Sequence, residues 1–171
     1  MNNFLAKLKN SNNNNDNSVY SPCSGKVHIL EDSTDPAFND GSMGKGCYIV
    51  PESDYLYSPI DGTVLMVFPT KHALGLRSKD GTEILIHIGI DTVELKGKYF
   101  EIEVNKGDKI NAGDLIASVD FNAIKTLNYK TDLFVIVTNP KTIDLHINFK
   151  AIKHGDLLFT LTSEIKEVDG K

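Results

Sequence analysis

Cysteine is scarce in this 171-residue chain, and its two copies are poorly spaced for metal or redox chemistry. Cys23 and Cys47 belong to no CxxC pair, which argues against a zinc ribbon or a redox motif and is typical of a reducing compartment. A chain of this length buries about two-thirds of the surface that its unfolded form exposes. We therefore expect one domain that folds without disulfide or metal crosslinks.

Long apolar runs and excess positive charge are also absent. No apolar run approaches the roughly 18 residues of a membrane span, and the N-terminus lacks the uninterrupted apolar region of a signal peptide. Lys and Arg number 18 against 23 Asp and Glu, a net charge of −5, which argues against binding to nucleic acid. The sequence predicts a cytoplasmic monomer whose charge-steered partners are basic.

The N-terminal segment differs in composition from the rest. Residues 10–17 read NSNNNNDN, a polar stretch that cannot bury enough apolar surface to offset the cost of ordering. We expect residues 1–18 to form a flexible leader and residues 19–171 to form the folded domain. Phe4, Leu5 and Leu8 share one face of a possible short helix. A frayed tail is the simpler interpretation, and a weak membrane or partner anchor is the alternative.

From Val19 onward, turn signals alternate with short β-prone runs. Asp-Gly, Gly-Asp and Ser-Gly pairs recur between runs rich in Val, Ile, Leu, Phe and Thr, at residues 62–68, 82–90, 115–119, 133–138 and 156–161. This pattern predicts an all-β protein, an antiparallel sandwich or barrel, with at most short helical turns such as residues 122–127. Two similar segments, SPCSGKV at 21–27 and SPIDGTV at 58–64, favour a sandwich of two similar halves.

A predicted hairpin relates two of the five histidines. Asp80-Gly81 favours a two-residue turn, which would pair Lys79 with Thr82 and place His72 and His87 on one face. As diagonal neighbours they would lie roughly 7–8 Å apart. A loop one residue longer or shorter would place them on opposite faces.

Neighbouring residues in this register suit a small reactive site. Thr70 shares the parity of His72 and can orient its ring, while Gly89 leaves room for a group to approach. Ile84, Ile86 and Ile88 are expected to point into the core. From spacing alone three interpretations stay open: phosphoryl transfer by paired imidazoles, metal ligation, or a chance pairing on the surface.

The residues around His87 carry a family resemblance. GTEILIHIGIDTVELKG at 81–97 resembles the phosphorylation-site signature of the glucose-family IIA components of the bacterial phosphoenolpyruvate-dependent sugar phosphotransferase system. Four further segments are similar to that family in the same order: DPAFNDGSMGKG at 35–46, SPIDGTV at 58–64, FPTKHA at 68–73 and KGDKINAGDL at 106–115. The resemblance covers about residues 19–161 and implies a β-sandwich of the duplicated barrel-sandwich hybrid type.

The resemblance assigns roles by position. His87 matches the residue that accepts a phosphoryl group from phosphorylated HPr and passes it to the IIB domain of a sugar permease. His72 matches a partner histidine that stabilises the phosphoryl group, Thr70 matches the hydroxyl that orients His72, and Asp91 matches a rim carboxylate. The phosphoryl group would originate from phosphoenolpyruvate through enzyme I. The resemblance implies no cofactor.

Matching positions also outline a docking surface, apolar at its centre and acidic at its rim. The residues concerned are Asp35, Ala37, Phe38, Met43, Phe68, Leu85, Ile88, Val93 and Glu94. The implied partners are HPr and a IIB domain, and the resemblance also allows regulated enzymes or transporters as partners. Docking on the permease would bring the chain transiently to the membrane. His72 and His87 could also share a zinc ion with a partner, although two ligands alone bind zinc weakly.

Two other classes share parts of these motifs. His87 to Asp91 reads HxGxD, which resembles part of the zinc site of lysostaphin-type peptidases, but the HxH segment that such enzymes need is missing. Residues 104–115 resemble a biotinyl or lipoyl carrier module, but Lys125 lacks the setting of an acceptor lysine. We therefore expect an IIA-type phosphocarrier, with the peptidase as the alternative.

Overall fold

A computed structural model describes residues 17–139, 142–144 and 151–162. The predicted leader therefore lies outside the described residues, apart from its last two positions. The described chain is all-β, as predicted. Its strands are β1 (Ser18–Tyr20), β2 (Gly25–Ile29), β3 (Lys45–Pro51), β4 (Tyr55–Tyr57), β5 (Gly62–Val67), β6 (Ala73–Ser78), β7 (Glu83–Ile88), β8 (Phe100–Ile102), β9 (Lys109–Ile110), β10 (Leu115–Val119), β11 (Leu133–Val137), β12 (Thr142–Asp144), β13 (Ala151–Ile152) and β14 (Leu157–Thr162).

Helical structure in the described residues is short. The predicted helix is present as α2 (Phe121–Thr126), which Asp120 caps by accepting a hydrogen bond from the Ala123 amide at 2.9 Å. The sequence analysis did not predict α1 (Pro36–Asn39) or the 3₁₀ turns η2 (Leu30–Asp32) and η3 (Thr92–Leu95). No helix among the described residues is long and apolar enough to cross a membrane.

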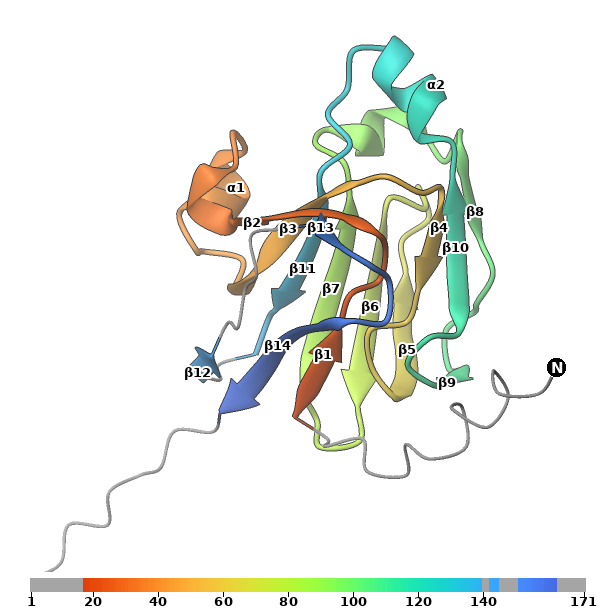
Figure 1. The fold of residues 1–171 in the computed structure, drawn as a ribbon. Helices are drawn as coiled ribbons and strands as arrows, with labels where there is room; N and C mark the ends of the chain where they lie inside the picture. The colour runs from red at the N-terminus through yellow and green to blue at the C-terminus, as the bar shows by residue number, and fades with distance from the viewer. Residues whose placement is uncertain (1–16, 140–141, 145–150, 163–171) are drawn as a thin grey trace, which may run out of the picture.

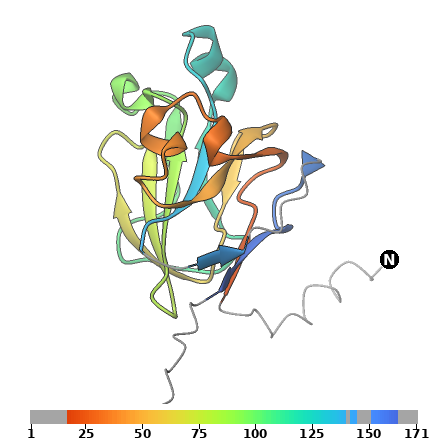
Figure 2. The same ribbon diagram turned by 90° about the vertical axis from the view of Figure 1, so that its left-hand side faces the viewer.

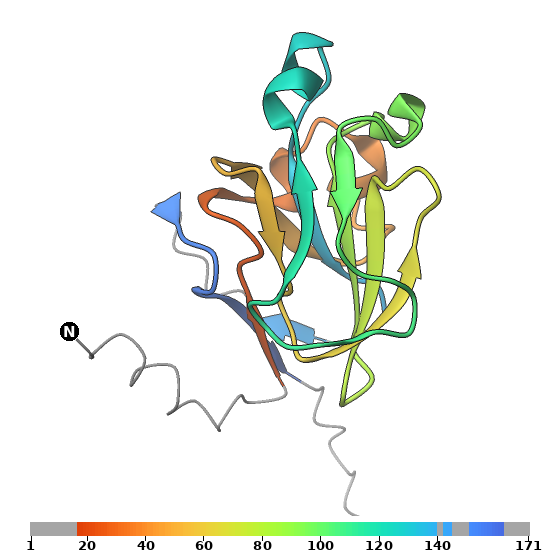
Figure 3. The ribbon, with the colours of Figure 1, turned by 90° about the vertical axis from the view of Figure 1, so that its right-hand side faces the viewer.

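The strands form three antiparallel sheets in the described part of the chain. The largest has eight strands in the order β13-β2-β3-β11-β7-β6-β5-β9, and two smaller sheets have the orders β4-β10-β8 and β1-β14-β12. In Figure 1 the β4-β10-β8 sheet lies on one side of the large sheet and α1 on the other. Figure 3 shows β4, β10 and β8 in front of the large sheet. The molecule is therefore a sandwich with one extra helical turn on its outer face.

The similar segments 21–27 and 58–64 lead into strands with comparable places in the large sheet. The first contains the start of β2 and the second the start of β5, and each of these strands lies second from an end of the sheet. Local hydrogen bonds repeat as well: Ser21 donates to the Cys23 carbonyl and Ser58 to the Ile60 carbonyl, both at 2.7 Å. The two segments therefore have matching local structure, and the duplication of the whole sandwich stays a prediction.

The two faces of the large sheet bury different clusters. Alternate residues of β7, Ile84, Ile86 and Ile88, enter the main core between the sheets, as predicted. Leu85 joins a smaller cluster on the outer face, with Phe38 of α1 and Phe134 of β11. His87 shares this outer face, because Leu85 and His87 have the same parity along the strand.

The predicted hairpin register was wrong by one residue. β6 and β7 pair Ala73 with His87 and Arg77 with Glu83, so the loop contains three residues, 79–81, instead of two. The Asp80 carboxylate explains the longer loop, since it accepts hydrogen bonds from the Thr82 amide at 3.2 Å and the Thr82 hydroxyl at 3.1 Å. Gly81 closes the loop with φ of +87°, a conformation that suits glycine.

Candidate functional site

His87 lies on the outer face of β7, near the middle of the large sheet. Its ring is surrounded by three others: Phe38 at a centroid distance of 4.9 Å, His72 at 5.0 Å and Phe134 at 6.0 Å. All three rings meet His87 at steep angles, with interplanar angles of 60°, 83° and 74°. The imidazole is therefore held edge-on in an aromatic pocket, and Figure 2 shows α1 lying over this face.

His72 reaches the same face by a route that the sequence analysis did not predict. The three-residue loop would place His72 on the opposite face if β6 extended to it, but β6 begins at Ala73. Before the strand, Lys71 adopts a left-handed φ of +58° and donates its amide to the Phe68 carbonyl at 2.8 Å. This turn redirects the chain, and the two histidines come together despite the wrong register.

Thr70 holds the ring of His72, as predicted. Its hydroxyl lies 2.6 Å from Nδ1 of His72, and the His72 carbonyl accepts a hydrogen bond from the Ile88 amide at 2.8 Å. Both the backbone and the ring of His72 are thus fixed relative to β7. Phe68 closes this side with its ring centroid 5.6 Å from that of His72.

Both imidazoles are poor bases in this setting. Burial, reinforced by the neighbouring His72, lowers the pKa of His87 from 6.5 to about 4, with the Gly89 backbone and Asp35 acting in the opposite direction. Burial also lowers the pKa of His72, whose side chain is 8% exposed. At neutral pH both rings are therefore uncharged, and uncharged imidazole is the nucleophilic form.

The two ring nitrogens of His87 have different environments. Nδ1 is buried, and the Gly89 backbone acts on this ring as a hydrogen-bond partner that raises its pKa. A reacting group can therefore approach only Nε2. The site offers one accessible imidazole nitrogen beside a second, oriented imidazole.

Asp91 and Gly89 were both predicted beside the histidine pair, and only Gly89 differs from expectation. The Asp91 side chain is exposed at the start of η3, on a backbone with φ of +59°, and no hydrogen bond between its carboxylate and either histidine is present in the described residues. Gly89 does not leave open space, because a Cβ there would lie 2.4 Å from Thr92 and 2.8 Å from the Lys130 carbonyl. Its φ of +78° instead makes the turn after β7 possible.

The predicted docking residues divide by exposure. Met43 is 40% and Val93 47% exposed, and Ala37 and Glu94 are also exposed. Asp35 and Phe68 are half-buried, and Leu85 is 9% exposed. Ile88 is wrongly assigned, because it is fully buried in the main core on the other face of β7. Phe38, at 3% exposure, has too little surface to contribute much to docking.

The described residues around the histidine pair offer few ligands for a metal ion. No three His, Cys, Asp or Glu side chains come together as a metal site in the described part of the chain. Cys23 and Cys47 are buried in the core with raised pKa values, so both stay protonated. A zinc ion shared by His72, His87 and a partner remains a prediction.

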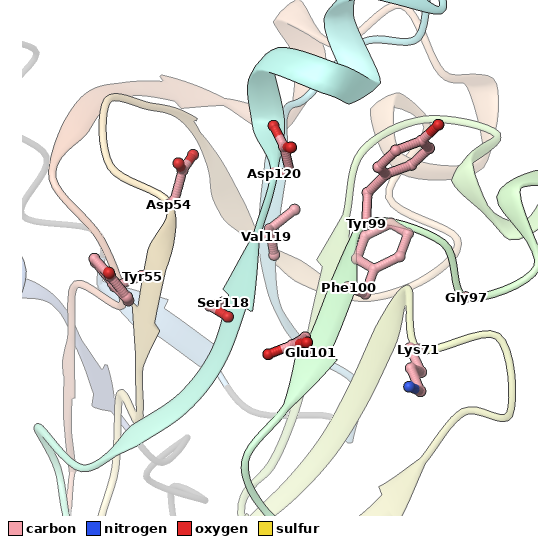
Figure 4. A pocket seen from close by; sticks show the side chains of 10 residues that line it. All are labelled: Asp54, Tyr55, Lys71, Gly97, Tyr99, Phe100, Glu101, Ser118, Val119 and Asp120. Atoms are coloured by element: carbon pink, nitrogen blue, oxygen red, sulfur yellow. The ribbon is translucent and has the colours of Figure 1, made fainter.

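A separate open groove of about 620 Å³ lies on the β4-β10-β8 sheet. Figure 4 shows its lining, in which Asp54 and Glu101 are acidic, Tyr55 and Tyr99 are aromatic, and Ser118 is a neutral polar residue. Lys71 borders it, one residue from both Thr70 and His72. Neither histidine lines this groove. We place the candidate site at the histidine pair, because the two imidazoles that could carry chemistry meet there.

Sequence reasoning missed one contributor to the site and gave another a different role. Phe134 pairs with His87 across β7 and β11 and forms the floor of the aromatic pocket. The run LFVIV at 133–137 predicted a buried strand, but no sequence signal placed it beside β7. Asp35 was assigned to docking, yet its side chain caps α1 by accepting from the Ala37 amide at 2.9 Å.

Comparison with known proteins agrees with this geometry. Residues 17–143 match the family described as phosphoenolpyruvate-dependent sugar phosphotransferase system, EIIA 1. A β-glucoside-specific EIIBCA component of Dickeya chrysanthemi is 45% identical over 124 residues, which are 72% of this chain and 20% of that protein. A glucose-specific EIIA component of Halalkalibacterium halodurans is 40% identical over 121 residues, 71% of this chain and 70% of that protein.

A solved structure shares the fold. The glucose permease IIA of Mycoplasma capricolum superposes with a TM-score of 0.79 at 35% identity, covering 83% of this chain and 93% of that one. The chain spans only about a fifth of the multi-component EIIBCA relatives. The peptidase alternative receives no support from these matches. The chain belongs to the EIIA 1 family of the phosphoenolpyruvate-dependent sugar phosphotransferase system.

Proposed function

We propose that this chain is a phosphocarrier that accepts a phosphoryl group on Nε2 of His87 from phosphorylated HPr and transfers it to the IIB domain of a sugar permease. The observation that carries the proposal is the pair of uncharged rings 5.0 Å apart, of which one exposes a single nitrogen. Membership of the EIIA 1 family supports HPr as the donor, and relatives that carry EIIA and EIIB in one chain support a IIB acceptor.

His72 acts on the transferring group in this proposal. If the Thr70 hydroxyl donates to Nδ1 of His72 across their 2.6 Å contact, the proton of that ring resides on Nε2. That N–H can donate to a phosphoryl oxygen and stabilise the negative charge in the transition state. The ring needs no reorientation during the reaction, because Thr70 already fixes it.

The exposed residues around the pair supply the docking surface. Met43 and Val93 are apolar and well exposed, while Asp91 and Glu94 are exposed acids at η3. Such a surface suits transient contact with a partner that is basic around an apolar centre. We assign Asp91 to this rim and give it no part in chemistry.

The proposal is tested by incubating the protein with phosphoenolpyruvate, enzyme I and HPr and measuring its intact mass. We expect one acid-labile phosphoryl adduct on the wild type and none on His87→Gln. His72→Gln should still be labelled but should pass the group poorly to a IIB acceptor. His154→Gln is the matched control, since His154 is exposed and stacks on Tyr57 at 4.4 Å. An unlabelled wild type beside a labelled control IIA protein would refute the proposal.

A further inference from the structure

A second cavity, of about 380 Å³, lies at the edge of the large sheet where β5, β6 and β9 meet. Three basic residues, Arg77, Lys79 and Lys109, line it, and none of its described lining residues is acidic. The chain as a whole carries a net charge of −5, so this gathering of positive charge is unusual for the molecule. The cavity should therefore attract an anion.

The strand register brings two of these cations together. Thr63 of β5 pairs with Lys109 of β9 on one side and with Arg77 of β6 on the other. Direct partners in antiparallel strands point to the same face, and neighbouring strands lie about 4.8 Å apart. Lys109 and Arg77 therefore flank Thr63, one strand away on each side. Both cations can reach an anion that lies over the Thr63 hydroxyl.

The guanidinium of Arg77 is oriented before any ligand arrives. Its Nε and Nη2 donate to the Glu83 carboxylate at 3.2 and 2.6 Å, which leaves its other N–H groups available. No salt bridge to Lys79 or Lys109 is present in the part of the chain that the structure describes. An oriented arginine beside two unpaired lysines suits a phosphate group, whose oxygens accept charge-assisted hydrogen bonds from both residue types.

The size and the neutral lining of the cavity favour a small polar ligand. Its volume is at the lower end of the range for small-molecule sites. Thr63 and Asn111 line it beside the cations, and a hydroxyl and an amide can each donate and accept hydrogen bonds. Sugar hydroxyls need such partners. The cavity thus combines groups for a phosphate with groups for a sugar.

We propose that this cavity binds the phosphomonoester of a small sugar, with the phosphate between Arg77 and Lys109 and the sugar hydroxyls towards Asn111. The choice of a sugar ester rests on the proposed function, because sugars are the final acceptors of a sugar phosphotransferase system. The anion site itself does not rest on it. Arg77 pairs with Glu83, which lies four residues, about 13 Å, along β7 from His87. A bound ligand therefore leaves His87 open to its partners.

Isothermal titration calorimetry of the full chain with glucose 6-phosphate tests the binding, with glucose and inorganic phosphate as separate probes. We expect saturable binding of the ester, weaker binding of inorganic phosphate and none of glucose. Lys109→Gln and Arg77→Gln should each weaken binding of the ester roughly ten- to hundredfold, as expected for loss of a charged hydrogen bond. Lys125→Gln is the matched control, since this exposed lysine lies on α2, at the opposite end of the molecule from β9 (Figure 1). It should bind as the wild type does.

Nuclear magnetic resonance locates the bound ester. Glucose 6-phosphate should shift the amide signals of Thr63, Arg77 and Lys109 and leave that of His87 in place. Absence of saturable binding, wild-type affinity in Lys109→Gln, or shifts centred on His87 would overturn the inference. Equal affinity for inorganic phosphate would overturn the assignment to a sugar ester. These measurements use unphosphorylated protein, so their outcome is separate from whether His87 takes a phosphoryl group.

Discussion

Burial of a basic group sets the protonation state of His87, on which the proposed function depends. Desolvation disfavours the charged form, so the ring titrates at about 4 instead of 6.5 and is available as a nucleophile over the whole neutral range. A neighbouring imidazole strengthens this effect, and the Asp35 carboxylate weakens it.

These opposing contributions can be measured one residue at a time. His72→Gln should raise the pKa of His87, because it removes a neighbour that disfavours the imidazolium. Asp35→Asn should lower the pKa of His87, because it removes a negative charge that favours the imidazolium. Histidine titration followed by nuclear magnetic resonance measures both shifts, and shifts of the same sign in the two variants would contradict this account.

Thr70 should matter through its hydroxyl alone. Thr70→Val keeps the shape of the side chain but removes the hydrogen bond to His72, which is worth about 1 kcal/mol. We expect transfer to a IIB acceptor to slow roughly fivefold, the equivalent of that free energy. Thr70→Ser should restore most of the rate. Stopped-flow measurement of transfer to the IIB acceptor compares the two variants with the wild type. A full wild-type rate in Thr70→Val would show that the hydroxyl does not orient the ring.

At the scale of elements, the two turns that flank β7 each contain a glycine, but the space around the two glycines differs. Gly81 and Gly89 have similar φ values of +87° and +78°. A Cβ at Gly81 would meet nothing within 4 Å, whereas one at Gly89 would lie 2.4 Å from Thr92. The turn at Gly89 is therefore packed tightly against Thr92 of η3, and this packing fixes the chain where it leaves β7.

Substituting alanine at Gly81 and at Gly89 separates the free-energy cost of backbone strain from the cost of overpacking. Gly81→Ala should cost roughly 1 kcal/mol of unfolding free energy, from the left-handed conformation alone. Gly89→Ala should cost about 1–3 kcal/mol more, because the added methyl group collides with its neighbours. Urea denaturation of both variants measures the difference. Equal losses would mean that the turn after β7 relaxes without cost.

Much of the fold could be predicted at this scale, and the misses have physical causes. Strands β5, β7, β10, β11 and β14 followed from β-prone runs between glycine turns. The hairpin loop did not, because the Asp80 side chain closes a longer turn that Asp-Gly alone does not indicate. The meeting of His72 with His87 was predicted from an incorrect register, and the left-handed Lys71 turn produces it instead. Phe134 lay beyond prediction, since strand neighbours distant in sequence leave no local signal.

For the whole molecule, the low pKa of His87 links stability to pH. The unfolded chain binds a proton at this residue below about 6.5, while the folded protein binds it only below about 4. Stability from this residue is therefore complete above pH 6.5, falls as the pH drops towards 4, and does not fall further below that value. His87 should thus destabilise the folded protein in mild acid.

His87→Gln tests that linkage. Between pH 7 and pH 4.5 the wild type should lose about 2–3 kcal/mol more unfolding free energy than the variant does. Urea denaturation at both pH values measures the two losses, and the Asp and Glu residues contribute equally to both proteins. Parallel losses would indicate that the His87 ring charges in the folded protein as easily as in the unfolded chain.

The large sheet has β7 near its centre, paired with β11 on one side and β6 on the other. Amide hydrogens in such a strand exchange with solvent only when the whole domain opens, so the backbone that carries His87 should be among the slowest to exchange deuterium. The residue of β11 that pairs with His87 is Phe134, which is fully buried and whose ring lies 6.0 Å from the imidazole. One central strand thus carries the imidazole, and its neighbour supplies the rigid surface on which that imidazole rests.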